Sequence, residues 1–466
     1  MESHAQSAED YLIEGLSFKL APGASYVTNR RSVTFYPQGG NSYAPNGVKV
    51  IRLALTGEGW LDPSTVRVMF DLNNTASGTE KYLKTIGGPW SFFRRMRLLA
   101  NGVVIEDIDN YARTHQMFHT LVSPSKRAND TIEGFGWEGD ILRNRGTHAH
   151  PDGLPGQNAL TYYGMAPGAG RTVLFKPLSG LFSQTKYIPL RFCPLILELE
   201  VVNDFTDPVV VATPPAFGVI DLEAFTPQNS STEWLISQVQ IKCDLVTLDS
   251  GLENEYTAHL LKGGNLPINY DTYISQMQTI ADYNYSCNIT RSLTRLKSVF
   301  VNFDGDATGE IGPAGPLTLP LSGAEFRKSF NDFYHPSGDN IIQRQDKEIE
   351  FQIQIGSKMY PEYPIRSVQE AFSQLVKCLG VNNSAFHGID VIAQEYRSHK
   401  FIIGIDTEKI LEAGWTGINT KAGDLMVIKV KQASGISQAK LCNKMYITLH
   451  SDNVLSILNS GVEVFD

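Results

Sequence analysis

The feature that most constrains the fold is a strict alternation of apolar and polar residues over short stretches. Residues 348–355 read EIEFQIQI, so the isoleucines and the phenylalanine share one face while glutamates and glutamines share the other. Because strand side chains point alternately to opposite faces, this pattern predicts a β-strand with one buried and one wet face. The pattern recurs at 195–201 and 238–245. Many such strands without interleaved helices indicate antiparallel sandwiches.

A short helix follows strands of this kind in each half of the chain. In the first half, the strands 95–100 and 103–106 flank Asn101-Gly102, a dipeptide that tolerates the positive φ values of a type I′ hairpin turn. Asp109 or Asn110 can then cap a helix that runs to about residue 122. The first half therefore has the order strand, turn, strand, helix.

Two capping boxes predict helices in the second half. Ser367 and Glu370 have the spacing at which each side chain can bond the other residue's backbone N–H, and Gly380 suits a left-handed helix end. Ser250 and Glu253 have the same spacing and predict a helix that ends near residue 262. The second half thus repeats the order of the first with longer connections.

These patterns predict an all-β protein made of two tandem eight-stranded antiparallel jelly rolls with a few short helices. Residues 1–45 show little periodicity and are expected to form an irregular N-terminal arm. The first jelly roll is expected at 46–225 with a long loop at 123–170. The second is expected at 226–466 with a long loop at 304–345.

Composition excludes several classes of protein. The 466 residues are 42% hydrophobic and 19% charged, which provides for real cores and argues against disorder. The net charge of −9 disfavours non-specific nucleic-acid binding, and no sequence-specific nucleic-acid partner is predicted. The five scattered cysteines are expected to be free thiols of a reducing compartment. No apolar run is long enough to predict a membrane span, and contact with a membrane is left open.

Three short motifs suggest chemistry, and each has a simpler explanation. Asp249-Ser250-Gly251 resembles half of an aspartic protease signature, but the second half is missing and Ser250 can serve as a helix cap. His148, His150 and Asp152 give only a weak metal signal. The segment from Asp304 starts like a calcium loop, but its twelfth position is Gly315, which has no side-chain oxygen. The sequence therefore predicts no catalytic, cofactor-binding or metal-binding residue, and no enzyme.

Four segments resemble the major capsid proteins of the double-jelly-roll, adenovirus-like lineage, in particular those of Polinton-like viruses, virophages and adintoviruses. They are 91–108 (SFFRRMRLLANGVVIEDI), 355–376 (IGSKMYPEYPIRSVQEAFSQLV), 414–430 (GWTGINTKAGDLMVIKV) and 451–466 (SDNVLSILNSGVEVFD). They lie in both halves, and they are structural strand-and-turn segments that carry no catalytic signature.

The resemblance implies a structural protein of a virion, assembled inside the host cell. Three chains would form a homotrimeric capsomer with a pseudo-hexameric outline, and such capsomers would tile the icosahedral shell of a double-stranded DNA virus. The partners would be further copies of the chain, neighbouring capsomers and a minor penton protein with a single jelly roll. The long loops would form outward towers or contact neighbouring subunits. No cofactor would be needed.

Two other classes remain open from the sequence alone. A carbohydrate-binding or adhesion protein with paired jelly rolls would expose an aromatic platform, and Tyr162-Tyr163 is the sequence feature that suggests one. A secreted-type jelly-roll enzyme would carry disulfides or clustered His and Met ligands.

Overall fold

The computed structural model describes most of the chain. The described residues are 26–78, 81–135 except 82, 84 and 86, 165–209, 231–304 except 281, 349–380, 400–410, 416–421, 425–432 and 444–466, with isolated positions at 333, 335–336, 388–389, 391, 393, 396 and 442. The predicted loop 304–345 lies almost entirely outside these ranges. Of the predicted loop 123–170, the part between 136 and 164 lies outside them, as do His148, His150, Tyr162 and Tyr163.

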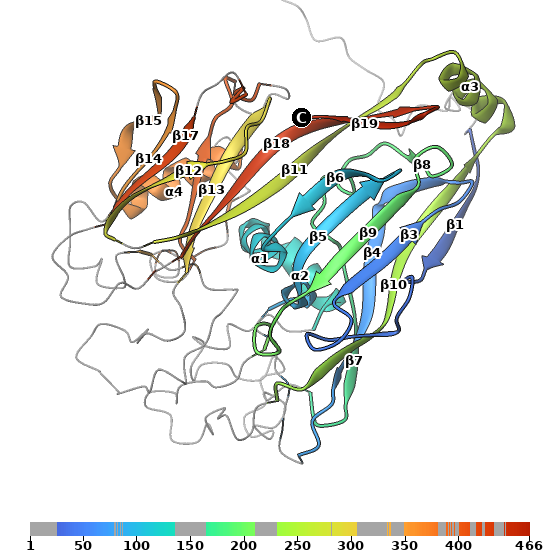
Figure 1. Cartoon of the computed structure of the whole chain (residues 1–466), viewed down its shortest axis with the longest axis horizontal. Coiled ribbons are helices and arrows are strands. Elements are labelled where there is room, and N and C mark those ends of the chain that lie inside the picture. Colours follow the sequence, from blue (N-terminus) through green and yellow to red (C-terminus); the bar gives the residue numbers. More distant parts are fainter. Residues whose placement is uncertain are drawn as a thin grey trace, which may run out of the picture.

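The first half of the chain folds into two facing antiparallel sheets (Figure 1). One sheet has the order β1-β10-β4-β7, with the short β2 and β8 paired to β10 and β4, and the other has the order β3-β9-β5-β6. The strands are β1 (Val27–Phe35), β2 (Ser42–Tyr43), β3 (Val50–Leu55), β4 (Trp60–Asn74), β5 (Phe93–Ala100), β6 (Val103–Ile108), β7 (Gly170–Phe175), β8 (Ile188–Pro189), β9 (Leu195–Val201) and β10 (Trp234–Leu248).

The second half repeats this arrangement. Its sheets have the orders β11-β18-β13-β16 and β12-β17-β14-β15, and β19 extends the first of them by pairing with β18. The strands are β11 (Leu266–Thr279), β12 (Asn284–Ile289), β13 (Leu296–Asp304), β14 (Ile349–Ile355), β15 (Lys358–Ile365), β16 (Ile402–Asp406), β17 (Met426–Gln432), β18 (Lys444–Leu458) and β19 (Gly461–Phe465).

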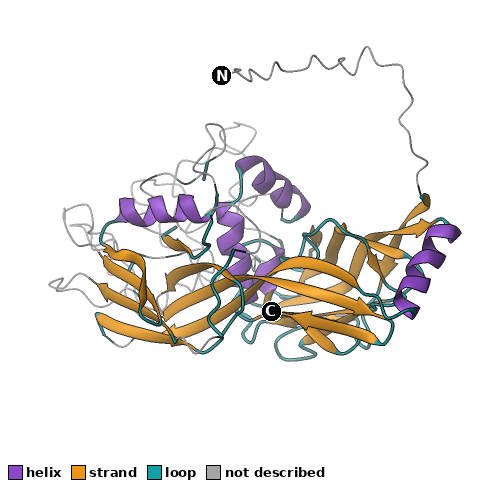
Figure 2. Cartoon of the chain, turned by 90° about the horizontal axis from the view of Figure 1, so that it is seen from above, coloured by secondary structure: helices purple, strands orange, loops and turns teal. Residues whose placement is uncertain are grey.

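Both halves have the strand order of a jelly roll. If the eight main strands of each half are numbered along the chain, the two sheets read 1-8-3-6 and 2-7-4-5 in both cases. The predicted all-β fold of two tandem jelly rolls is therefore confirmed. The two sandwiches lie side by side, and their strands form two groups when the molecule is seen from above (Figure 2).

The described helices occupy corresponding places in the two halves. After the hairpin β5–β6 come α1 (Tyr111–Leu121) and α2 (Pro124–Glu133), and after β14–β15 comes α4 (Val368–Cys378). The remaining helix, α3 (Ser250–Leu261), joins the last strand of the first half to the first strand of the second. The predicted helices and the hairpin turn are confirmed, with positive φ at Asn101 and Gly102.

The helix caps follow the predicted chemistry only in part. Ser367 caps α4, because its hydroxyl accepts the Glu370 N–H at 3.2 Å, but the Glu370 carboxylate accepts from the backbone of Arg366. The prediction that Ser250 caps α3 was wrong by one residue. The Asp249 carboxylate accepts the Gly251 N–H at 3.0 Å, so Ser250 is the first helical residue.

Two predictions about the domain boundaries need correction. Residues 27–35, assigned to an irregular arm, form β1, which pairs with β10. The strand β10 itself begins at Trp234, inside the segment assigned to the second jelly roll, yet it pairs with β4 of the first. The alternation of β10 identified it as a strand. Alternation alone carries no information about which sheet the strand joins.

Two large apolar cores fill the sandwiches, and each receives residues from the other half. The first core includes Ile268 and Tyr270 of β11 and Leu455 of β18, and the second includes Met117 of α1. Four of the five cysteines are buried and Cys378 is half-buried; all five are free thiols, as predicted. No described helix combines the length and apolar character needed to cross a bilayer.

The two caps provide a matched test of the helix boundaries. Ser367→Ala and Asp249→Ala should each lower the free energy of unfolding by about 1 kcal/mol, because each leaves a helix N–H without its acceptor. Ser250→Ala should change it by only a few tenths of a kcal/mol. Urea unfolding of the three variants beside the parent checks this. Equal losses for Ser250→Ala and Asp249→Ala would contradict the assigned cap.

Candidate functional site

The described residues contain no constellation that could hold a metal ion, since no group of three or more His, Cys, Asp or Glu side chains converges among them. The motifs weighed in the sequence fall in different places. Asp249 is a helix cap, Asp304 ends β13, and His148, His150 and Asp152 lie outside the described residues.

One pocket of about 190 Å³ opens between the end of α4 and the sheet that contains β13 and β16. Two of its lining residues begin a serine-histidine-aspartate series, since Ser298 Oγ lies 3.0 Å from His450 Nδ1 and His450 Nε2 lies 3.4 Å from Asp271 Oδ1, outside the lining. Its lining residues are Lys297, Ser298, Lys377, Cys378, Leu379, Gly380, Asp406, Glu408 and His450.

This Ser-His-Asp series lacks what acyl transfer requires. Residue 298 pairs with strands on both sides, so the backbone around it is committed to the sheet. The two lysines of the pocket, Lys297 and Lys377, are balanced by the carboxylates Asp406 and Glu408, and the carbonyl end of α4 lies beside them, so the lining offers no net positive charge to an oxyanion. Burial also raises the pKa of the Cys378 thiol to about 12, which keeps it protonated and unreactive. The pocket is therefore a polar packing site.

Two buried charged residues, Arg113 and Glu106, lie at the junction between the two jelly rolls. Helix α1 of the first half packs on the sheet of β11, β13 and β18, where the Phe118 ring lies 4.7 Å from that of Tyr273 and 5.2 Å from that of Phe300. Strand β6 meets β11 beside it, and Tyr270 donates to the Ile105 carbonyl at 3.0 Å. One helix and one strand of the first half thus bind one sheet of the second.

Arg113 anchors α1 in this junction. Its side chain is 2% exposed, and its guanidinium donates to Asn302 Oδ1 and to the Phe303 carbonyl, each at 2.8 Å. Asp304 supplies a counter-charge at 3.4 Å, and the guanidinium also stacks 4.6 Å from the ring centre of Tyr446. A buried arginine is tolerated only with such a set of partners.

Glu106 is the second buried charged group at the junction. It is 1% exposed, and its carboxylate accepts the Gly180 N–H at 2.8 Å and the Ser179 hydroxyl. Burial raises the pKa of Glu106 to about 7, although these hydrogen bonds act in the opposite direction, and the charge of Asp271 on β11 adds to the rise. The packing is close, since a Cβ on Gly180 would overlap the backbone of Asp271.

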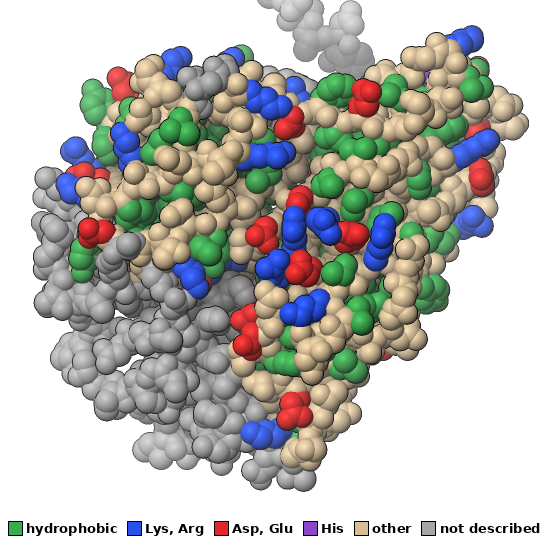
Figure 3. Space-filling model, in the orientation of Figure 1, with side chains coloured by type: hydrophobic (Ala, Val, Ile, Leu, Met, Phe, Trp, Pro, Cys, Tyr) green, Lys and Arg blue, Asp and Glu red, His purple; other side chains and the backbone are tan. Residues whose placement is uncertain are grey.

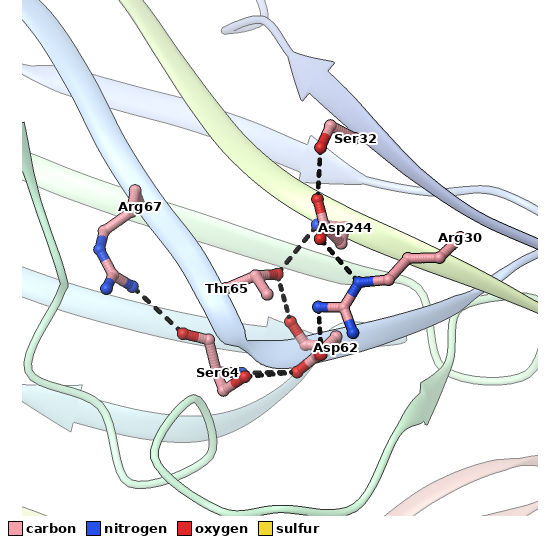
Figure 4. A network of polar contacts seen from close by, with 7 residues as sticks. All are labelled: Arg30, Ser32, Asp62, Ser64, Thr65, Arg67 and Asp244. Carbon is pink, nitrogen blue, oxygen red and sulfur yellow. Dashed lines mark hydrogen bonds and ion pairs between the residues drawn. The ribbon is translucent and has the colours of Figure 1, made fainter.

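A network of ions and hydroxyls fastens β1 to the first jelly roll (Figure 4). Arg30 donates to Asp244 on β10 and to Asp62 on β4, each at 2.8 Å, and Ser32 donates to Asp244 at 2.6 Å. Hydrogen bonds from Ser32 and Arg30 hold the pKa of Asp244 below its usual range. Polar contacts thus hold a strand whose own side chains are mostly exposed.

The outer face of the sheet β3-β9-β5-β6 carries interleaved charges of both signs (Figure 3). Arg95 and Arg97 of β5 lie on this polar face. Arg95 forms a two-pronged bond to Asp107, and Glu198 lies 2.7 Å from Arg97 and 3.7 Å from Arg52. Because these arginines are already paired with carboxylates, this face is a poor site for phosphates.

No family model matches the sequence, and no curated protein matches it. Solved structures match over almost the whole chain. VP54 of the virus PBCV-1, fitted into a reconstruction of the virophage Sputnik, is 12% identical, covers 96% of this chain and 98% of its own, and has a TM-score of 0.58. This chain has the double-jelly-roll fold.

Two further double jelly rolls agree with this assignment. The Sputnik virophage structure has a TM-score of 0.57 at 10% identity and covers 98% of this chain and 92% of its own. The Faustovirus major capsid protein has a TM-score of 0.52 at 8% identity and covers 96% of this chain and 93% of its own. The resemblance found in the sequence is therefore confirmed at the level of the fold.

Removing the Arg113 guanidinium should be costly. Arg113→Met keeps most of the volume but leaves Asn302 Oδ1 and the Phe303 carbonyl without the donor, so the free energy of unfolding should fall by roughly 3 kcal/mol. The matched control is Arg94→Met, whose half-exposed pair with Glu200 should contribute below about 1 kcal/mol. Urea unfolding measures both. Equal losses would show that Arg113 does not anchor the junction.

Glu106 should make stability depend on pH. Its folded pKa of about 7 exceeds its usual 4.5, so the folded state binds more protons between these values and stability falls as pH rises through this window. The loss is at most about 3 kcal/mol. Glu106→Gln removes the titrating group. The thermal midpoint of the variant should therefore rise relative to that of the parent as the pH increases from 5 to 8. Parallel pH profiles for the two proteins would refute this.

Proposed function

We propose that this chain is the major capsid protein of an icosahedral double-stranded DNA virus. The observation that carries the proposal is the presence of two jelly rolls with the same strand order in one chain, which match VP54 and the Faustovirus major capsid protein over more than nine tenths of each chain. The protein would reside in the virion and be assembled inside the host cell.

Three copies of the chain form the capsomer in this proposal. Each copy contributes two similar sandwiches, so a closed ring of three copies has six similar corners and a pseudo-hexameric outline. Such a ring uses head-to-tail contacts, which close when the rotation between neighbours fits. A six-cornered outline can tile a shell. The other partners are neighbouring capsomers and a penton protein with a single jelly roll.

We also propose a division of the chain that follows the strand pairing. The first jelly roll spans β1 to β10, the second spans β11 to β19, and α3 is the link between them. The protein acts without a cofactor and is not an enzyme. Supporting this, Ser298 of the Ser-His-Asp series lies on β13, whose backbone is paired with a strand on each side.

The trimer is the first test. Purified protein should elute with a light-scattering mass near three times the 51.6 kDa of the chain, and negative-stain microscopy should show particles with a hexagonal outline. A stable monomer at micromolar concentration would overturn the proposal. Binding of that monomer to a glycan array would favour the adhesion class in its place.

A further inference from the structure

The two halves supply corresponding elements whose surroundings can be compared. Strand β1 opens the first sandwich as β11 opens the second, and both pair with the last strand of their sandwich. The strand before the helix is β6 in the first half and β15 in the second, and the helix is α1 or α4. The two members of each pair occupy the same place in their own jelly roll but have different surroundings.

The junction inside the chain uses one member of each pair. Strand β6 and helix α1 of the first half meet β11 of the second. The other members, β15, α4 and β1, take no part in it. In Figure 1, β15 and α4 lie at one end of the molecule, while β1 and α3 lie at the opposite end.

Burial separates the two sets of elements. Nine of the eleven residues of α1 are buried, whereas three residues of α4 are. Strand β1 is exposed at the five positions 28–32, whereas in β11 every second residue from Ile268 to Thr272 is buried. Glu106, two residues before the end of β6, is 1% exposed, and Tyr363, two residues before the end of β15, is 80% exposed.

Large exposed side chains lie at both ends of the molecule, on β15 and beside β1. Tyr363 lies on β15, and Tyr26 and Tyr36, exposed by 63% and 64%, flank β1. Exposed tyrosines are enriched in protein–protein interfaces, where an apolar ring and a polar tip suit a surface that is wet before binding. Edge strands such as β1 and β15 are also the places where a sheet accepts a neighbour.

We propose that β15 and α4 of one copy dock against β1 of a second copy, and so repeat between chains the junction that β6, α1 and β11 make within the chain. This rests on the proposed homotrimer and assigns its interface. The contact is heterologous, because the two surfaces belong to opposite ends of the molecule. It is also directional, so in a closed ring of three copies every β15 surface and every β1 surface is occupied by a neighbour.

Site-directed cross-linking tests the assignment. The double variant Asn29→Cys, Tyr363→Cys places one thiol on β1 and one on β15, and a short bis-maleimide should join different chains into covalent dimers and trimers in denaturing gels. The control Asn29→Cys, Tyr283→Cys keeps the β1 thiol and moves the other to Tyr283, beside β12 at the far edge of the β15 sheet. It should remain monomeric in the same gel. The three single variants are treated in parallel to measure any contribution from Cys378.

A charge variant provides a second readout. Tyr363→Glu should shift the light-scattering mass from trimer towards monomer without lowering the thermal midpoint of the monomer, whereas Tyr283→Glu should leave the trimer intact. If the parent is a trimer but the two double-cysteine variants cross-link to the same extent, this interface is wrong and the capsid proposal stands. A monomeric parent would overturn both.

Discussion

The structure depends on the packing of one helix and one strand of the first sandwich against one sheet of the second. The contact buries Arg113 and Glu106, two groups that are costly to remove from water. Arg113 bonds to Asn302 and the Phe303 carbonyl of the second half, and Glu106 accepts from Ser179 and Gly180 of the first. Polar groups that must be paired tolerate few alternative placements. The junction therefore fixes the two sandwiches in one relative orientation, which gives the molecule two different ends.

Local chemistry accounts for what the sequence could predict. Strands such as β14 and β10 have one buried and one wet face, so the alternation identifies them, and the turn at Asn101-Gly102 and the cap at Ser367 need only neighbouring residues. Pairing partners lie far apart in sequence, which is why β10 was assigned to the wrong half. Arg113 meets Asn302 and Glu106 meets Ser179 across long separations, so no local pattern revealed the junction.

Two edge strands, β1 and β15, lack the alternation that marks the central strands. Strand β1 has the sequence VTNRRSVTF and is held by polar contacts to Asp62 and Asp244, so its exposed half has no apolar face to detect. Strand β15 contains Pro361 and Pro364, which remove backbone donors and are tolerated because β15 is the last strand of its sheet. Both strands lie at an end of the molecule, and β1 is exposed at positions 28–32 and Tyr363 of β15 is 80% exposed.

The junction within the chain and the interface proposed between copies face different chemical demands. The internal one forms once, within a chain whose halves are tethered by α3, so it can bury Arg113 and Glu106 against preformed partners. A surface that joins separate copies must first stay soluble in water, which a large apolar patch would prevent. Threonine, asparagine and arginine on β1, with single tyrosines at the margins, meet that requirement. The same requirement removes the alternation from the sequence, so the strands best suited to assembly are the ones that sequence patterns identify least well.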